Sequence, residues 1–261
     1  MKNIKYGALF LALVGIGFAS CEKDDTAKEI EKGNERQTEV KELLVEAKSF
    51  SKEHDDHVLR VLNKIEEANL PSITEENFSD YCNVIEEELD VKLDISSQMD
   101  SEFLKVDFAD EEIKLADYIE DKKAKEYLNK IDNLLFNSDG NIAKLIDEIN
   151  ALEIKLVAEK SIDLNTMRST LNGIETLKGS LVLWTNYYNN GDMTKSACQN
   201  WGKIKKALFV AAADALGALI GSFGVTFVVN GTAIVIPPGF VGSAIGAGAV
   251  SVLAAMFVYL C

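Results

Sequence analysis

The sequence is poor in the side chains from which most catalytic and metal sites are built. Its 261 residues include two histidines and four cysteines. His54 and His57 lie three residues apart on a predicted helix and could approach a metal ion from one face, with carboxylates completing the site. Because there is no third histidine, we interpret them as a pair on a solvated, charged helix face. The chain also contains no glycine-rich phosphate loop, nucleophile elbow or zinc-spaced cysteine pair. We therefore expect no enzyme activity, no cofactor and no metal, and identify no small-molecule substrate.

Basic residues are scarce as well. The chain has 27 lysines and arginines against 42 aspartates and glutamates, a formal net charge of −15 at pH 7. Residues 207–261 contain a single charged residue, Asp214, so the acidic excess lies in the middle of the chain. An acidic middle disfavours nucleic acid, because phosphate binding depends on lysine and arginine. It also disfavours attraction to anionic lipid headgroups.

Only three prolines interrupt the chain, and the glycines are concentrated near its C-terminal end. In the middle, apolar residues recur at spacings of three and four, which is typical of amphipathic helices. Pro71 ends the first predicted helix, Ser72 and Glu75 form a capping-box signature for the second, and the third is expected at about residues 110–136. Turns at residues 138–140 and 189–192 follow the third and fifth helices. The five apolar stripes are Val40, Leu43, Leu44, Ala47, Phe50, Val58, Val61, Leu62 and Ile65; Phe78, Tyr81, Cys82, Ile85 and Leu89; Ile113, Ala116, Ile119, Ala124, Leu128, Ile131 and Leu135; Ile142, Leu145, Ile146, Ile149, Leu152 and Leu156; and Met167, Leu171, Ile174, Leu177, Leu181 and Trp184.

The last 55 residues differ from the rest by their lack of charge. Residues 207–229 and 239–260 are apolar stretches, each long enough to cross a bilayer. Between them, Asn230 and Gly231 lie at the centre of two β-branched runs over residues 225–236, which is the strongest short-range signal for a β-hairpin. We therefore predict a mainly α fold, an elongated antiparallel helical bundle over residues 38–193. It is followed over residues 194–261 by a glycine-rich apolar helix, a β-hairpin or tongue, and a second helix.

Small residues recur on both apolar segments. Rows of this kind let two helix backbones approach closely, so we expect the two apolar helices to pack on each other. The rows are Gly217, Gly221 and Gly224 on the first segment, and Gly242, Gly246 and Ala249 on the second.

Three arrangements are possible for the apolar residues 207–260: burial within a soluble bundle, conditional insertion into a target bilayer, and a permanent membrane span. Asp214 opposes spanning, because an aspartate near the centre of an inserting helix costs about 2.5–3.5 kcal/mol. Glycine and alanine dilute both segments further. We favour burial, with self-association or a target bilayer as the partners that residues 207–260 could have.

The N-terminus resembles that of a bacterial lipoprotein. Lys2 and Lys5 precede an uncharged apolar stretch over residues 6–18, which is typical of a signal peptide. Residues 16–21 end in Phe18, Ala19, Ser20 and Cys21 and resemble a lipobox, with Phe18 replacing the usual aliphatic residue. The alternatives are an ordinary secretory signal and a short membrane anchor. The resemblance implies a signal peptide at residues 1–20 and an acylated Cys21 that attaches the mature chain to a membrane.

The four residues that follow Cys21 indicate a more specific location. Glu22, Lys23, Asp24 and Asp25 resemble the acidic export signal of Bacteroidetes-type lipoproteins, which implies the outer face of the outer membrane; a solvated charged linker is the alternative. We expect residues 21–37 to form the acylated N-terminus and a linker. Residues 25–27 resemble the O-glycosylation acceptor of the same bacteria, although chance explains three residues better.

The C-terminal architecture weakly resembles α-helical pore-forming toxins of the cytolysin A and haemolysin BL type. In those proteins two apolar stretches and a short hairpin form the part that enters the membrane. The resemblance covers architecture alone, and it departs from the toxins because here the apolar part runs to residue 261. It implies a membrane-active effector as the alternative to a non-catalytic lipoprotein whose bundle is an interaction or structural module.

Two further groups of residues are candidates for structural roles. Cys198 precedes the first apolar helix and Cys261 ends the second, so an antiparallel arrangement would bring them close enough for a disulfide in an oxidising compartment; free thiols are the alternative, with Cys82 in the core. The aromatic residues Trp184, Tyr187, Tyr188 and Trp201 could form a ligand platform or an interfacial belt, but packing is the better interpretation.

Overall fold

The computed structural model describes residues 4–71, 77–91, 93–96, 104–107, 113–190, 202–220, 225–229, 232–236 and 244–260. The chain divides into two compact units, Met1–Glu42 and Leu43–Cys261. The described part of the first unit is the beginning of helix α1 (Ile4–Glu67), which runs through the predicted signal peptide and the predicted linker.

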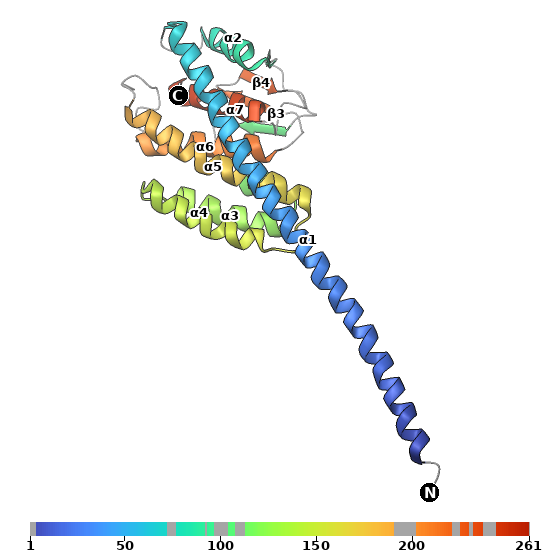
Figure 1. Ribbon diagram of the computed structural model, residues 1–261. Coiled ribbons are helices and arrows are strands. Elements are labelled where there is room, and N and C mark those ends of the chain that lie inside the picture. Colours follow the sequence, from blue (N-terminus) through green and yellow to red (C-terminus); the bar gives the residue numbers. More distant parts are fainter. Residues whose placement is uncertain are drawn as a thin grey trace. The chain divides into compact units, whose positions relative to one another are not determined.

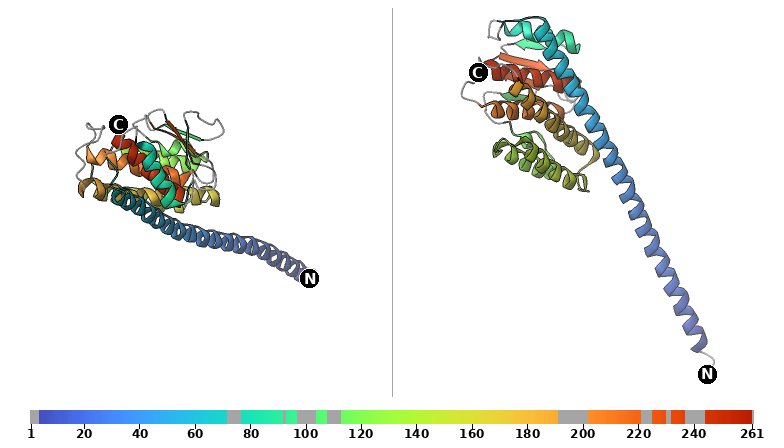
Figure 2. Two further views of the ribbon diagram at one scale, coloured as in Figure 1. Left: turned by 90° about the horizontal axis from the view of Figure 1, so that it is seen from above. Right: turned by 60° about the vertical axis from the view of Figure 1, so that its left-hand side comes forward.

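The described residues are mainly helical, as the sequence predicts. Figures 1 and 2 show α6 beside α5 and α7 in the second unit, α3 and α4 packed together and against α5, and α2 beside α7. The rest of α1, residues 43–67, lies against α5 and α7. The helices that follow α1 are α2 (Phe78–Leu89), α3 (Lys122–Phe136), α4 (Ile142–Val157), α5 (Leu164–Asn190), α6 (Lys203–Leu219) and α7 (Ala244–Leu260).

The predicted apolar stripes form much of the core. All six stripe residues of α5, from Met167 to Trp184, are fully buried. In α2 the stripe residues from Tyr81 to Leu89 are buried, and α4 buries Leu145, Ile149 and Leu156. Burying one face of an amphipathic helix is the main source of its stability in a folded protein.

The third predicted helix begins about twelve residues too early, and this prediction is wrong. Helix α3 begins at Lys122, after a short 3₁₀ helix, η1 (Leu115–Tyr118). The Asp121 side chain caps α3 by accepting hydrogen bonds from the backbone N–H groups of Lys123 and Ala124. The buried carboxylate of Asp132 accepts from the N–H groups of Leu115 and Ala116, at 3.0 Å each, and so holds η1 against α3.

A four-stranded sheet joins two distant parts of the chain. Its strands are β1 (Asp94–Ser96), β2 (Leu104–Asp107), β3 (Val225–Val229) and β4 (Thr232–Ile236), in the order β1-β4-β3-β2. Strands β3 and β4 are antiparallel, with Val229 opposite Thr232. Strand β1 pairs antiparallel with β4, whereas β2 pairs parallel with β3. The sequence does not predict a strand within residues 94–107, because strands this short carry little periodicity.

Helices α6 and α7 are shorter than the apolar stretches that contain them. Each is 17 residues long, whereas the stretches in the sequence span 23 and 22 residues. Within the ranges that the structure describes, no helix combines the length and apolar character that a membrane span requires.

Candidate functional site

The apolar helix α6 carries a fully buried carboxylate. Asp214 is 0 % exposed and has alanine on either side of it in the sequence. Its Oδ2 atom accepts a hydrogen bond of 2.8 Å from Nε1 of Trp184 on α5. This bond joins the two helices at a point where all neighbouring residues of α6, from Phe209 to Ile220, are buried.

His54 approaches the same carboxylate from α1. Its side chain is 0 % exposed, which makes the predicted solvated position wrong. Nδ1 donates to Oδ1 of Asp55 at 3.0 Å, and Nε2 lies 3.9 Å from Oδ2 of Asp214. The imidazole therefore lies between two carboxylates, one at the edge of α1 and one in the core. The error arose because residues 53–57 are mostly charged, and charge in sequence does not reveal which side of α1 faces α5 and α7.

Two hydroxyl groups complete what we name the Asp214 cluster: Asp214, His54, Trp184, Ser180 and Ser251. Ser180 is on α5 and Ser251 is on α7, so the cluster draws on four helices. Both hydroxyls lie near Asp214 and favour its ionised form, but neither makes a hydrogen bond within the described part of the chain. Oδ1 of Asp214 and Nε2 of His54 are likewise without a hydrogen bond there.

Burial dominates the electrostatics of the cluster. Removal from water raises the pKa of Asp214 to about 6, although His54, the two hydroxyls and Trp184 act in the opposite direction. Burial also raises the pKa of Tyr188, and the neighbouring Tyr187 and Asp214 add to this effect. Because all five side chains of the cluster are buried, the arrangement is suited to proton binding and to joining helices.

The aromatic residues beside the cluster pack against one another. Trp184 and Tyr188 are buried, and ring centroids 5.4–5.8 Å apart link Trp184, Tyr187 and Tyr188. Packing is thus confirmed for these residues, whereas Trp201 lies outside the described residues.

A second buried polar network joins α4 to α5. Nζ of Lys178 lies 2.8 Å from Oε2 of Glu153 and 3.1 Å from Oε2 of Glu175, and it donates to Oδ1 of Asn150. Burial, followed by the charge of Glu153, raises the pKa of Glu175, and Lys178 opposes the shift. One ammonium shared by two carboxylates joins the helices, while Oε1 of Glu153 and Oε1 of Glu175 are buried and make no hydrogen bond within the described residues.

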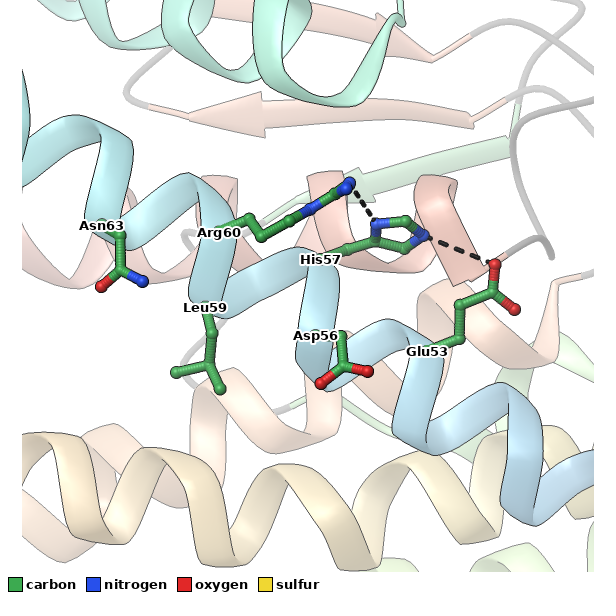
Figure 3. A pocket seen from close by; sticks show the side chains of 6 residues that line it. All are labelled: Glu53, Asp56, His57, Leu59, Arg60 and Asn63. Atoms are coloured by element: carbon green, nitrogen blue, oxygen red, sulfur yellow. Dashed lines mark hydrogen bonds and ion pairs between the residues drawn. The ribbon is translucent and has the colours of Figure 1, made fainter.

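The exposed side of α1 carries an open hollow of about 560 Å³, drawn in Figure 3. Arg60 donates from Nη2 to Nδ1 of His57 at 2.8 Å, and Nε2 of His57 lies 3.6 Å from Glu53. Burial and then Arg60 lower the pKa of His57. All the lining residues come from three turns of one helix, so the hollow is a surface feature. Within the described ranges, no three His, Cys, Asp or Glu side chains are grouped as metal ligands.

Several residues named from the sequence have a definite place in the fold. Gly217 lies where α6 meets α7: a Cβ atom there would be 3.1 Å from Cβ of Val250 and 3.2 Å from Cα of Ala247. Gly246 is buried in α7, and Cys82 is a buried free thiol. Burial raises the pKa of Cys82 to about 12.

Other named residues cannot be placed in the same way. Cys21 and the four residues after it lie on α1, in a part whose side chains the structure does not describe. Outside the described residues altogether are Cys198, Gly221, Gly224, Asn230, Gly231, Gly242 and Cys261.

No protein-family model, curated protein or solved structure matches this chain.

Proposed function

We propose that the mature chain is a non-catalytic lipoprotein of the cell envelope, anchored by an acylated Cys21 and exposed on the outer membrane. Its helical unit would act as an interaction or structural module. The observation that carries this proposal is the enclosure of the apolar helices: residues 209–220 of α6 and 246–256 of α7 are buried without a break. A helix that is buried all round belongs to a core.

The helices that precede the apolar segment account for this enclosure. Helix α5 packs along α6, α2 and α1 contact α7, and η1 also contacts α6. The apolar segment therefore has a role within the unit and is not required as a membrane tether. A lipid on Cys21 supplies the tether, since each buried methylene contributes about 0.8 kcal/mol to membrane binding.

The proposal includes a C-terminal unit of glycine-rich helix, β-hairpin and helix. Its support is the register of β3 and β4, which places Val229 opposite Thr232 and leaves two residues for the connection. A two-residue loop of asparagine and glycine suits such a turn. In this proposal the hairpin is held by β1 and β2 and does not extend from the unit as a free tongue.

Metabolic labelling with an alkyne fatty acid tests the anchor. The wild-type chain, expressed in a Bacteroidetes host, should incorporate the label, and Cys21→Ala should abolish it. Cys82→Ala is the matched control, because that thiol is buried in the helical unit, and it should keep the label. A label that survives Cys21→Ala contradicts the proposal.

Protease treatment of intact cells tests surface exposure. The wild type should be cleaved, and a variant in which residues 22–25 are replaced by alanine should be protected, because it would stay on the periplasmic side. Equal protection of both chains contradicts the surface location and leaves the lipid anchor intact.

A second function, a membrane-active effector, is favoured by one observation. The segment that carries a single charge, residues 207–261, contains most of α6 and all of β3, β4 and α7. These elements are contiguous in sequence and could leave the other helices together. Entry into a target bilayer would then require α6 to separate from α5.

A reversible crosslink between α5 and α6 tests this second function. A Cβ atom on Gly173 would lie 3.3 Å from Cβ of Leu219, close to the separation in a disulfide. A chain lacking residues 1–21, with its native cysteines replaced by serine and carrying Gly173→Cys and Leu219→Cys, would be added to dye-loaded vesicles. Leakage that appears only after reduction supports the effector; no leakage from the reduced chain or the wild type at any pH contradicts it.

A further inference from the structure

The Asp214 carboxylate is poorly accommodated in the folded unit. It makes one hydrogen bond, to Trp184, and Nε2 of His54 lies 3.9 Å from the same oxygen. Its other oxygen makes no hydrogen bond within the described residues. An isolated buried carboxylate normally requires more partners than this. A neutral asparagine could accept the same hydrogen bond from Trp184 without the cost of burying a charge, so packing alone does not account for the charge of Asp214.

The surrounding sequence indicates where that role lies. Asp214 is the only charged residue among residues 207–229. In the folded unit this stretch is divided between α6 and β3. A chain that is exported through the inner membrane, however, crosses before it folds. The membrane then meets 23 consecutive residues, enough to span the hydrocarbon core as one helix.

We propose that Asp214 acts during export, where its charge prevents residues 207–229 from being retained in the inner membrane as a spanning helix. This inference rests on the proposed export of the chain. After folding, Trp184, His54 and the two hydroxyls hold the carboxylate that export required.

The position of the charge suits this role. Asp214 is the eighth of the 23 residues, inside the potential span and N-terminal to its centre. An aspartate at the centre shifts insertion by about 10²–10³-fold relative to leucine, and we expect a smaller shift, still above about 10-fold, at this position. Charges near the end of a span are tolerated better, because long side chains reach back to the interface. Lys206 lies immediately before the stretch and is two helical turns from Asp214, so it provides a matched position at the end. The second apolar segment, residues 239–260, has no charge, but glycine and alanine lower its hydrophobicity.

The test uses the full mature chain in a bacterial host. The native signal is replaced by a cleavable secretory signal peptide and Cys21 by serine, so that lipid does not fix the chain to a membrane. Cells are fractionated into periplasm and inner membrane, and carbonate extraction followed by flotation separates inserted chains from aggregates. The chains compared are the wild type, Asp214→Leu, Asp214→Glu and Lys206→Leu.

The wild type and Lys206→Leu should be recovered mainly from the periplasm. Asp214→Leu should be recovered mainly as carbonate-resistant protein in the floated inner membrane. The ratio of membrane to periplasmic protein should therefore be at least about 10-fold higher for Asp214→Leu than for the wild type. Asp214→Glu distinguishes retention from misfolding, because it keeps the charge while disturbing the packed cluster. Its release with the wild type supports the proposal. Release of Asp214→Leu, retention of Asp214→Glu, or retention of the wild type overturns it. None of these outcomes depends on acylation of Cys21, which the labelling experiment tests separately.

Discussion

Substituting Asp214 by asparagine should stabilise the second unit at neutral pH and have little effect in acid. Asparagine has almost the same shape and keeps an oxygen that can accept from Trp184, but it carries no charge. Burial raises the pKa of Asp214 from 3.8 to about 6. The folded state therefore binds this proton more tightly than the unfolded state does, and the associated stability is fully present below pH 3.8 and is lost as the pH rises through 6.

The magnitude follows from the two pKa values. A ratio of about 10² in proton affinity corresponds to ~3 kcal/mol, which is a large part of the stability of a domain. At pH 8 the wild type has lost all of this contribution, while the asparagine variant has none to lose. The difference in unfolding free energy between the variant and the wild type should therefore increase by ~3 kcal/mol between pH 3.5 and pH 8.

Urea denaturation of the chain lacking residues 1–21, followed by circular dichroism across this pH range, measures the difference. Taking the difference between two chains removes the contributions of titrating groups that do not interact with Asp214, including Asp132, whose pKa burial also raises to about 6. A difference that is constant with pH would refute the reasoning, because it would mean that Asp214 has the same pKa in the folded and unfolded chains. A variant that becomes less stable than the wild type at pH 8 would refute it as well.

Four further substitutions test the packing and the caps. Trp184→Phe removes the Nε1 donor of the 2.8 Å hydrogen bond to Asp214. It should lower the unfolding free energy by about 1–3 kcal/mol beyond the packing change, and more at pH 8 than at pH 5, in the same urea assay. Gly217→Val should lower the unfolding free energy by about 1–3 kcal/mol in thermal unfolding, because the new Cβ would lie within 3.2 Å of atoms of α7. Gly202→Ser is the control: position 202 has open space around it, so this substitution should be neutral or stabilising. Asp121→Ala should lower the unfolding free energy by about 1 kcal/mol, because two N–H groups of α3 lose their acceptor; an unchanged midpoint would exclude a capping role.

The helices could be predicted largely from local pattern. The stripe of α5 is fully buried, and α1 ends at Glu67, four residues before Pro71. The start of α3 could not be predicted in this way, because the apolar spacing continues through Ile113 and Ala116. The helix does not extend back to these residues, because the Asp132 carboxylate accepts a hydrogen bond from the N–H group of Ala116, sixteen residues earlier in the chain.

Only part of the candidate site could be predicted from the sequence. Asp214 is conspicuous as a lone charge in an apolar stretch, but nothing near it in the sequence indicates that His54 is its neighbour. The two residues are 160 positions apart in the sequence, and their approach depends on how α1 lies against α5 and α7. A histidine surrounded by charged residues looks exposed until the packing of its helix is known.

By itself, the sequence determined the helical character of the chain, because the repeat of apolar residues along a helix is a local property. It also located the stretch of residues 207–261 with its single charge, and it supports a lipid-anchored N-terminus that stays a prediction. Only the tertiary structure decided that α6 and α7 are enclosed, that β1 and β2 flank β3 and β4, and that four helices meet at Asp214. These features are long-range contacts, and their free energy comes from burying residues that are far apart in the chain.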